Sequence, residues 1–568
     1  MYYIGVSAYY HEASVFLTDG KGVNCFLKEE YFTRIKGDKN FPKRCINFLI
    51  EKFNLNNDNI EYVCFYEKPF KNWWEIFYYS IINPIKNRNL LISHLKNFNQ
   101  SSIFFYSDIN KIIEFPKKKI LYAPHHLSHC LNGASFISEH DKYAYITFDG
   151  VGDGETISIF VIEKKDLKIK KIFSKKYPHS LGLFYSTITD FLGFEINEGE
   201  FKVMSLSSYG KPVYEKEMKK IFDTNNFSLD MSYFNFHTNT NCSFSEKFCK
   251  VFGEPYLNIN NENNFKKYSN IASSAQFILE ETAKNLISKA KELSGKNKFV
   301  ITGGVALNCK MIQSLSGIEN VEEIIVPPSP GDSGSAIGAS NFANLYKNKK
   351  LFKLNTIFLG PDKKFINQNV EVESYFRKIT SDKNFIADAA KKLIDGEIIT
   401  SYYNKTEIGP RSLGNTSIFC NAKNSAAVKK LNAKVKKREF YQPLAPIICI
   451  DDFDKYFQSN SNITLNLEWM GTLCKATESA KKDYSSIIHV DGTCRTQIVK
   501  DKNSITYNLL EEIKKLGSDI LVNTSFNISN DPVVFDLLDV YVNMKRMNIK
   551  YVLMENGLYE TKEIWIRF

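Results

Sequence analysis

A strand, a turn of small residues and a second strand occur in that order at two places, and this repetition constrains the fold most. The first copy begins with strand 2–7, continues with strand 13–17 and closes on the hairpin signal Asp19-Gly20. The second copy has a strand, a glycine-rich turn and a strand over 144–148, 149–155 and 156–162. Such duplication predicts an α/β domain built of two related halves that face a cleft.

The clearest helical pattern spans 269–293. Ser269 is a predicted N-cap, apolar residues follow at helical spacing, and Gly295 ends the pattern. The segment before it, 213–268, is polar, rich in Asn and poorly periodic. Two interpretations of that segment stay open, an insertion that covers a substrate or a variable surface loop.

Two further strands each lead into a turn and a helix. Strand 299–302 is followed by Gly303-Gly304 and a helix from about Ala306. Strand 323–326 leads to helix 334–344, whose Gly and Ala content predicts close packing against a neighbour. This alternation of strands and helices supports an α/β fold.

The small-residue pattern stops near 345–358, where the charged stretch YKNKKLFK indicates a domain boundary. We therefore expect one domain over 1–350 and a second, smaller one over 360–568. The second has its own predicted strands and helices, at 398–402, 447–449, 520–522, 385–393 and 509–516.

Composition excludes several classes of protein. The net charge is +11, but the Lys residues are scattered, so a solvated surface is favoured over a nucleic-acid interface. Eleven Cys occur without a C-x-x-C pair, which disfavours zinc fingers and fits reduced thiols. The N-terminal residues lack a signal-peptide pattern, and no apolar run is long enough to span a membrane. A cytoplasmic protein without nucleic-acid or membrane partners is the expectation.

The sequence HHLSH at 125–129 concentrates three of the nine His residues. On a helix, His125 and His129 lie one turn apart on the same face, which suits two ligands of one metal ion. The alternative is a cluster that hydrogen-bonds at a helix start. Asp149, at a strand end, and Asp332, at a helix start, can complete a shell for Fe²⁺, Mn²⁺ or Zn²⁺.

Glycine-rich turns predict phosphate contacts at two places. Asp153 and Gly154 lie in the turn DGVGDGET, where glycines let backbone N–H groups approach phosphate oxygens. Gly303, Gly304 and Asn308 lie where a strand meets a helix start, which favours a nucleotide. Each pattern alone is also compatible with an ordinary tight turn.

The order of these features resembles the actin and sugar-kinase superfamily. In detail, HHLSH, FDGVGDGET, EGEFKVMSLSSYGKP, TGGVALNCK and PPSPGDSGSAIGA resemble the family of nodulation, cephamycin and tobramycin O-carbamoyltransferases. GPRSLGN, KKREFYQPLAP, VDGTCRTQIV and LVNTSFNISNDPVV continue the resemblance along the chain. It implies an N-terminal duplicated actin/sugar-kinase-like (ASKHA) domain, similar to the tRNA threonylcarbamoyladenosine transferase, and a YrdC-like second domain.

The resemblance implies an ATP-dependent O-carbamoyltransferase. Carbamoyl phosphate and ATP would give carbamoyl adenylate in the second domain, and the first domain would transfer the carbamoyl group to a hydroxyl of a sugar, surface glycan or natural product. Closed surroundings suit such an intermediate, because it hydrolyses easily. ATP with Mg²⁺ and a divalent metal, Fe²⁺ by analogy, are the implied cofactors. The oligomeric state stays open, with a homodimer as one alternative.

Residue by residue, the resemblance implies metal ligation by His125, His129, Asp149 and Asp332, and nucleotide binding at Gly303, Gly304 and Asn308. His11 matches a family His near the acceptor, a candidate general base or a structural residue. The implied anion-binding residues of the second domain are Lys436, Arg438, Arg495, Ser525 and Asn527, with Arg411 as an addition or a structural turn.

Two positions depart from the family pattern. Gln442 and Thr416 stand where relatives usually have Arg, which weakens the predicted phosphate site unless Lys434, Lys436 or Lys437 compensates. Three rival functions are carried: transfer to a thiol or amine, tRNA modification, and a non-catalytic nucleotide-binding assembly protein. The chain has no C-x-x-C pair, which argues against transfer to a thiol or amine. It shows no basic surface with interleaved aromatic residues, which argues against tRNA modification, and the His pair argues against a non-catalytic protein.

Overall fold

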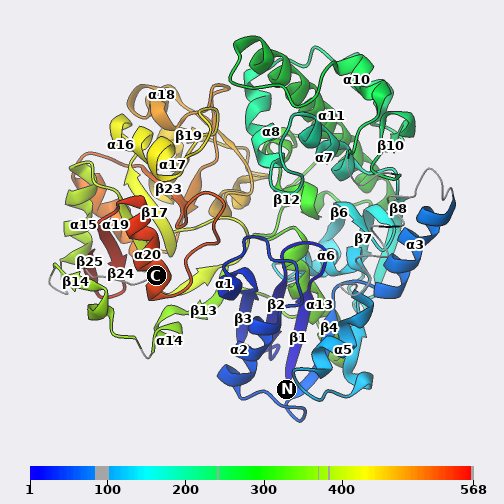
Figure 1. Ribbon diagram of the computed structural model, residues 1–568, viewed down its shortest axis with the longest axis horizontal. Coiled ribbons are helices and arrows are strands. Elements are labelled where there is room, and N and C mark those ends of the chain that lie inside the picture. Colours follow the sequence, from blue (N-terminus) through cyan, green and yellow to red (C-terminus); the bar gives the residue numbers. More distant parts are fainter. Residues whose placement is uncertain (83–91, 93–101, 239–241, 369, 381–383, 564–568) are drawn as a thin grey trace. The chain divides into compact units, whose positions relative to one another are not determined.

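The computed structural model describes residues 1–568 except 83–91, 93–101, 239–241, 369, 381–383 and 564–568. The chain forms two compact units (Figure 1). The first contains Met1–Asn24 and Lys39–Asn355, and the second contains Cys25–Asp38 and Thr356–Phe568. Helices and strands alternate in both units, which confirms the predicted mixed α/β fold.

The first unit is built around two sheets. In the first sheet the strands of this unit follow the order β2-β1-β4-β5, from Ser14–Thr18, Tyr2–Ser7, Ile60–Phe65 and Ile120–Tyr122. The second has the order β12-β11-β6-β7-β8, from Glu323–Ile325, Lys298–Thr302, Tyr143–Gly152, Glu155–Ile162 and Ile169–Lys176.

Both sheets share one pattern of strand direction. In the first, β1 is antiparallel to β2 and parallel to β4, which is parallel to β5. In the second, β6 is antiparallel to β7 and parallel to β11, which is parallel to β12. The carboxyl ends of three parallel strands therefore meet at one edge of each sheet, which is where α/β proteins bind ligands.

Two helices lie between the sheets, and both carry residues of the candidate site. α13 (Asp332–Asn348) packs on β1, β2 and β4, α6 (His125–Ala134) packs on β6 and β11, and the two helices contact each other (Figure 1). A Cβ atom at Gly338 would lie 1.7 Å from the Ser128 carbonyl oxygen. The predicted close packing of the Gly- and Ala-rich helix is confirmed, although the helix is longer than predicted.

The long helix of the first unit starts earlier than predicted. α11 spans Glu262–Ser294, because Asn261 accepts hydrogen bonds from the backbone N–H groups of Asn263 and Asn264 and so caps the helix. Ser269 is buried inside the helix rather than at its start. Gly295 ends the helix with φ 66°, as predicted.

Segment 213–268 is more ordered than its Asn-rich composition suggests. Its described residues include α9 (Glu215–Ile221) and α10 (Glu246–Phe252). Phe248 and Phe252 of α10 belong to a buried cluster of aromatic rings, together with Phe191, Phe234 and Phe244. Residues 239–241 lie outside the described part.

The other helices in the described part of the first unit have 6 to 14 residues. They are α2 (Lys43–Phe53), α3 (Pro69–Ile82), α5 (Phe105–Asn110), α7 (Leu181–Phe191), α8 (Glu200–Leu206) and α12 (Cys309–Ser314). The helix predicted from about Ala306 is instead a 3-10 turn over Gly304–Leu307, followed by α12. The Asn308 side chain accepts from Met311 N at 2.8 Å and starts α12 there.

The second unit has an eight-stranded sheet of order β14-β25-β24-β15-β17-β23-β18-β22. Its strands are Phe376–Lys378, Gly557–Thr561, Tyr551–Met554, Ile399–Tyr402, Thr416–Asn421, Leu521–Ser525, Ala445–Cys449 and Gln497–Val499. Smaller sheets pair β13 (Phe358–Asp362) with β16 (Lys405–Glu407), and β19 (Phe457–Gln458) with β20 (Cys474–Ala476) and β21 (Thr493–Cys494).

Alternate residues of the central strands face two apolar cores. Ile418 belongs to one core, together with residues of α16 (Ser425–Lys430) and α20 (Leu537–Met547). The next residue, Phe419, belongs to the other, with residues of α15 (Phe385–Ile394) and α19 (Ile505–Lys515). This period of two is expected for a sheet covered by helices on both faces.

Candidate functional site

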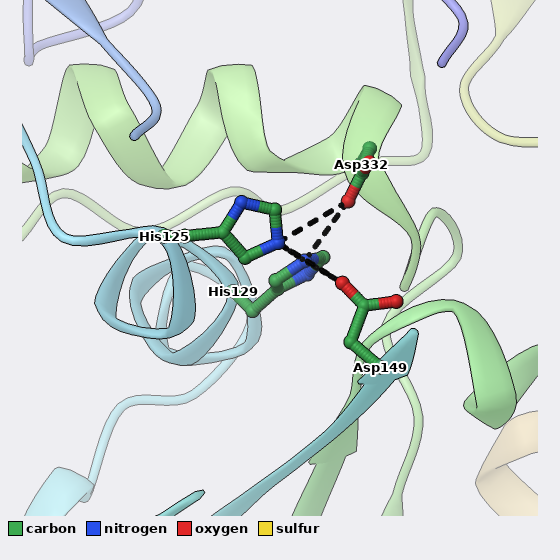
Figure 2. Close-up of side chains that lie close together, drawn as sticks. All are labelled: His125, His129, Asp149 and Asp332. Carbon is green, nitrogen blue, oxygen red and sulfur yellow. Dashed lines mark hydrogen bonds and ion pairs between the residues drawn. The ribbon is translucent and has the colours of Figure 1, made fainter. Parts of the chain in front are cut away.

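Four side chains that are far apart in the sequence meet in the first unit. His125 and His129 come from successive turns of α6, Asp149 from β6, and Asp332 from the first turn of α13 (Figure 2). One ligand atom from each lies within 4.8 Å of all the others. All four residues are at most 9% exposed. The structure thus brings together the four residues that the sequence proposes as metal ligands.

The spacing of these atoms suits a single cation. The two Nε2 atoms are 3.1 Å apart, and each lies within 3.5 Å of Asp149 Oδ2 and Asp332 Oδ1. Ligands at about 2.0–2.2 Å from one ion are separated from each other by roughly 2.8–3.6 Å. Two imidazoles and two carboxylates are a donor set for Fe²⁺, Mn²⁺ or Zn²⁺.

In this cluster, protonated imidazoles and ionised carboxylates stabilise each other. Burial opposes protonation of His125, but its hydrogen bond with Asp149 and the nearby carboxylates raise its pKa to about 10. Burial likewise opposes the charged form of Asp149, yet hydrogen bonds from both His residues hold the pKa of this carboxyl well below its usual range. The cluster therefore concentrates negative charge that either protons or a cation must balance.

Neighbouring backbone groups orient two of the four side chains. His129 Nδ1 lies 3.1 Å from the Pro330 carbonyl oxygen, so it carries the proton and leaves the Nε2 lone pair facing the cluster. Asp149 Oδ1 accepts from the backbone N–H groups of Gly150 and Gly304, at 2.9 and 3.2 Å. Its other oxygen, Oδ2, is left to face the imidazoles.

Glycine is required at two positions beside the cluster. A Cβ atom at Gly152 would lie 2.0 Å from His125 Cδ2. Gly303 has φ 91°, and a Cβ there would lie 1.9 Å from the Phe148 carbonyl oxygen. Since the Gly303 N–H donates to Pro330 O at 2.8 Å, this turn also holds the carbonyl that orients His129.

The other residues predicted to bind a nucleotide have internal partners. Asp153 accepts from the backbone N–H groups of His125 and Lys68, at 2.8 and 3.0 Å, so its carboxylate holds the start of α6. Gly154 has φ 76° in the turn between β6 and β7. The Asn308 amide exchanges hydrogen bonds with Gln276. As nucleotide contacts, all three stay predictions.

His11 lies in the loop between β1 and β2. Its ring packs edge-on against Tyr10, with centroids 5.2 Å apart. The loop is anchored by Tyr9, whose hydroxyl donates to Asp108 at 2.8 Å and whose backbone has φ 78°. A strained backbone at an aromatic residue is typical of functional loops. The proposed role of His11 as a base stays a prediction.

In the second unit, a buried ammonium group is surrounded by neutral oxygens. Lys436 Nζ donates to the carbonyl and side-chain oxygens of both Ser525 and Asn527, over 2.7 to 3.2 Å. Burial, with Arg438 and Lys36 nearby, holds the pKa of Lys436 well below its usual range. Three of the predicted anion-site residues therefore form one hydrogen-bonded group.

Arg438 and Arg495 place two positive charges near each other. Burial and then the charge of Arg495 lower the pKa of Arg438 to about 10. Arg438 donates to the Thr524 hydroxyl at 3.1 Å, and Arg495 Nε is buried without a hydrogen-bond partner among the described residues. Neighbouring, partly buried guanidinium groups with open donor capacity suit a phosphate or carboxylate.

Gln442 and Thr416, which stand where relatives usually have Arg, have different hydrogen-bond partners. Gln442 Nε2 donates to Glu439 at 2.6 Å. Thr416 Oγ1 accepts from Lys363 Nζ at 2.5 Å, and the same ammonium donates to the carbonyl oxygens of Tyr403 and Asn415. A buried cation therefore stands beside Thr416, but it is Lys363 rather than any of the lysines considered from the sequence.

Sequence reasoning missed Lys363 and also Glu67, which lies beside His125. Glu67 Oε2 is 3.9 Å from His125 Nδ1, and both side chains are buried. Its only signal in the sequence is an acidic residue directly after a buried strand. Because β4 and β5 are parallel neighbours, the residues that follow them meet at one sheet edge, and this brings Glu67 to His125.

No helix in the described residues is long and apolar enough to cross a membrane.

Comparison with known proteins identifies two family matches: residues 2–341 match the carbamoyltransferase N-terminus and residues 390–561 the carbamoyltransferase C-terminus. An uncharacterized protein of Synechocystis sp. is 28% identical over 97% of this chain and 95% of its own length. The nodulation protein NolNO of Sinorhizobium fredii is 26% identical over 93% of this chain and 75% of its own.

A third relative is the 3'-hydroxymethylcephem-O-carbamoyltransferase of Streptomyces clavuligerus, 27% identical over 44% of this chain and 46% of its own. The first family match spans the four clustered side chains, and the second spans the cations Lys436, Arg438 and Arg495. With both matches in chain order over most of its length, this protein belongs to the carbamoyltransferase family.

Proposed function

We propose that this protein is an ATP-dependent O-carbamoyltransferase. In this proposal the second unit makes carbamoyl adenylate from carbamoyl phosphate and ATP, and the first unit transfers the carbamoyl group to a hydroxyl of a sugar, surface glycan or natural product. The four-residue cluster of the first unit is the observation that carries the proposal, because its donor atoms could hold a cation, and that cation would bind the phosphate of the leaving AMP in a chain of the carbamoyltransferase family.

The first reaction needs positive charge around several phosphates. Water releases phosphate from carbamoyl phosphate, a carbamate oxygen attacks the α-phosphorus of ATP, and pyrophosphate leaves. Arg438 and Arg495 would bind these anions, since each charge-assisted hydrogen bond is strong in buried surroundings. Lys436 already donates hydrogen bonds to four oxygens of Ser525 and Asn527, so we propose that it positions these two residues.

The second reaction needs a base and charge compensation. The acceptor oxygen attacks the carbamoyl carbon, the bond from that carbon to the phosphate oxygen breaks, and AMP leaves. His11 would take the hydroxyl proton. A divalent cation held by His125, His129, Asp149 and Asp332 would offset the charge that develops on the departing phosphate. The hydrogen bond of His129 Nδ1 to Pro330 fits this ligand role.

We also infer the architecture of the two units. The strand pattern that the two sheets of the first unit share, with α6 and α13 between them, supports a duplicated actin/sugar-kinase-like fold for this unit. Gly303 and Gly304, at the carboxyl end of β11, would then approach the nucleotide. A YrdC-like fold for the second unit rests on the resemblance of its sequence motifs.

The test uses the full chain with ATP, carbamoyl phosphate, Mg²⁺ and Fe²⁺. We expect mass spectrometry to detect carbamoyl adenylate that depends on both substrates, and AMP release to increase when a suitable hydroxyl compound is added. A folded, metal-loaded protein that forms no carbamoyl adenylate would overturn the proposed first reaction. Adenylate formation without transfer to any of a panel of sugars and glycans would leave the first reaction standing and overturn the acceptor class.

A further inference from the structure

The loop after β4 lies beside His125. Tyr66, Glu67 and Lys68 follow this strand, and His125 follows the parallel neighbour β5 by three residues. The Tyr66 ring lies 5.1 Å from the His125 ring, centroid to centroid. The Lys68 backbone N–H donates to the same Asp153 carboxylate that accepts from His125 N. The loop and the histidine are thus held in one network.

His125 is fixed on nearly every side. Gly152 lies against one edge of its ring with no room for a methyl group, Tyr66 lies against the ring, and Asp149 Oδ2 lies 3.0 Å from Nε2. The side chain is 1% exposed. The remaining polar atom is Nδ1, on the opposite side of the ring from the cluster.

The two histidines differ at this Nδ1 atom. In His129 it has the Pro330 carbonyl oxygen at 3.1 Å and the Ser335 hydroxyl at 3.2 Å. In His125 it is buried and has no hydrogen-bond partner among the described residues. The nearest acid is Glu67, whose Oε2 lies 3.9 Å away. A buried N–H group without a hydrogen-bond partner costs about 1–3 kcal/mol. A hydrogen bond between His125 Nδ1 and Glu67 Oε2 would therefore stabilise the site.

Glu67 is placed to act on His125 rather than on the cluster. It is 4% exposed, its carboxyl also hydrogen-bonds Ser102, and it is not one of the four grouped ligands. A distance of 3.9 Å is too long for a direct hydrogen bond, but a shift of under about 1 Å or one bridging water closes it. Metal-binding histidines commonly donate Nδ1–H to a buried carboxylate in this way.

We infer that Glu67 is a positioning residue for the metal site, which holds His125 with its proton on Nδ1 and its Nε2 lone pair toward the cation. This inference rests on the proposed metal site. The Glu67 carboxylate would accept the Nδ1–H hydrogen bond and make the imidazole a better donor to the ion. His129 would have a neutral partner and His125 a charged one, so the two ligands differ in basicity.

The test compares Glu67→Gln with the unchanged protein in metal titrations of the full chain, using Fe²⁺ and Co²⁺ alone and no substrate. Gln keeps the size of the side chain but removes its charge. We expect affinity for both metals to fall about 10- to 100-fold, with unchanged stoichiometry and an altered visible spectrum of bound Co²⁺. Glu67→Asp should recover part of the loss, because a carboxylate is restored.

Ser335→Ala is the matched control, because it removes only a secondary partner of His129 and leaves Pro330 O in place. It should change affinity by less than about threefold. Equal affinities of Glu67→Gln and the unchanged protein would overturn the inference. If Glu67→Gln does not fold, the His125 ¹⁵N imidazole signals of the unchanged protein decide: a proton on Nε2 with metal bound would overturn it. An unchanged protein that binds neither metal would overturn the metal site as well, independently of any transfer assay.

Discussion

The Nε2 atoms of His125 and His129 lie 3.1 Å apart and both face the oxygens of Asp149 and Asp332. Two imidazole nitrogens this close cannot both carry an outward proton without repulsion, unless the carboxylates separate the charges. A shared cation would satisfy all four groups at once, which is the arrangement that the proposed metal site requires.

Replacing His129 should separate the two reactions. We expect His129→Asn to lose bound metal and to reduce carbamoyl transfer by more than about 100-fold, while carbamoyl adenylate forms at a rate close to that of the unchanged protein. Elemental analysis, mass spectrometry of the adenylate and an assay of the carbamoylated acceptor give the three measurements. His126→Gln is the control on the same helix, because His126 faces Ser158 instead of the cluster. Equal loss of both reactions in His129→Asn would contradict the assignment of one reaction to each unit.

Replacing the neighbouring guanidinium groups of Arg438 and Arg495 should reduce the first reaction and leave the metal site intact. Arg438→Met and Arg495→Met remove charge beside the proposed phosphates, so we expect kcat/KM for carbamoyl adenylate formation to fall about 100-fold or more. Metal content should stay unchanged. Arg377→Met, whose side chain is 68% exposed and pairs with Glu560, is the control. Adenylate formation at the normal rate in both Arg438→Met and Arg495→Met would exclude these residues from the anion site.

Gly152 gives a test of the metal site that leaves every ligand in place. Gly152→Ala puts a methyl group within 2.0 Å of His125 Cδ2, so we expect the imidazole to move and metal affinity to fall at least about 10-fold. Gly22→Ala is the matched control, since a Cβ there has no neighbour within 4 Å. Metal titration and thermal unfolding measure the two effects. Normal affinity in Gly152→Ala would mean that His125 tolerates displacement.

The lowered pKa of the buried Lys363 should make the free energy of unfolding depend on pH. Burial lowers its pKa to about 8, below the ordinary value for lysine, so the unfolded chain binds more protons between these two values. The free energy of unfolding should therefore rise with pH from about 8 to about 10.5, by roughly 3 kcal/mol from this group. We expect the difference between the unchanged protein and Lys363→Met, measured by urea unfolding at several pH values, to show this rise. A difference that is flat with pH would mean that Lys363 titrates normally.

Much of this architecture follows from local sequence patterns. The strands at 2–7 and 299–302 and the end of α11 at Gly295 are predictable, because apolar alternation and a terminal glycine act locally. Local patterns alone did not predict that His125 lies beside Asp149 and Asp332. That prediction also needed the resemblance to a known family, in addition to the positions of Asp149 at a strand end and Asp332 at a helix start.

Other features depend on contacts that no local pattern reveals. Glu67 reaches His125 because β4 and β5 are neighbours, and Lys363 reaches Thr416 across 53 positions of the chain. The start of α11 was missed because its first turns are polar and exposed, so no apolar stripe marks them. The aromatic cluster at α10 was missed because its phenylalanines are irregularly spaced.

Residues 25–38 have a consequence for how the protein is made. This segment belongs to the second unit, where Arg34 donates to the carbonyl oxygens of Val533 and Pro532 and pairs with Asp539, and where Tyr31 stacks on Phe535. These early residues leave the ribosome long before their partners are synthesised. The second unit can therefore complete its structure only after residues 532–539 have been synthesised, and a separately expressed C-terminal half would leave Phe535 and Asp539 without these contacts.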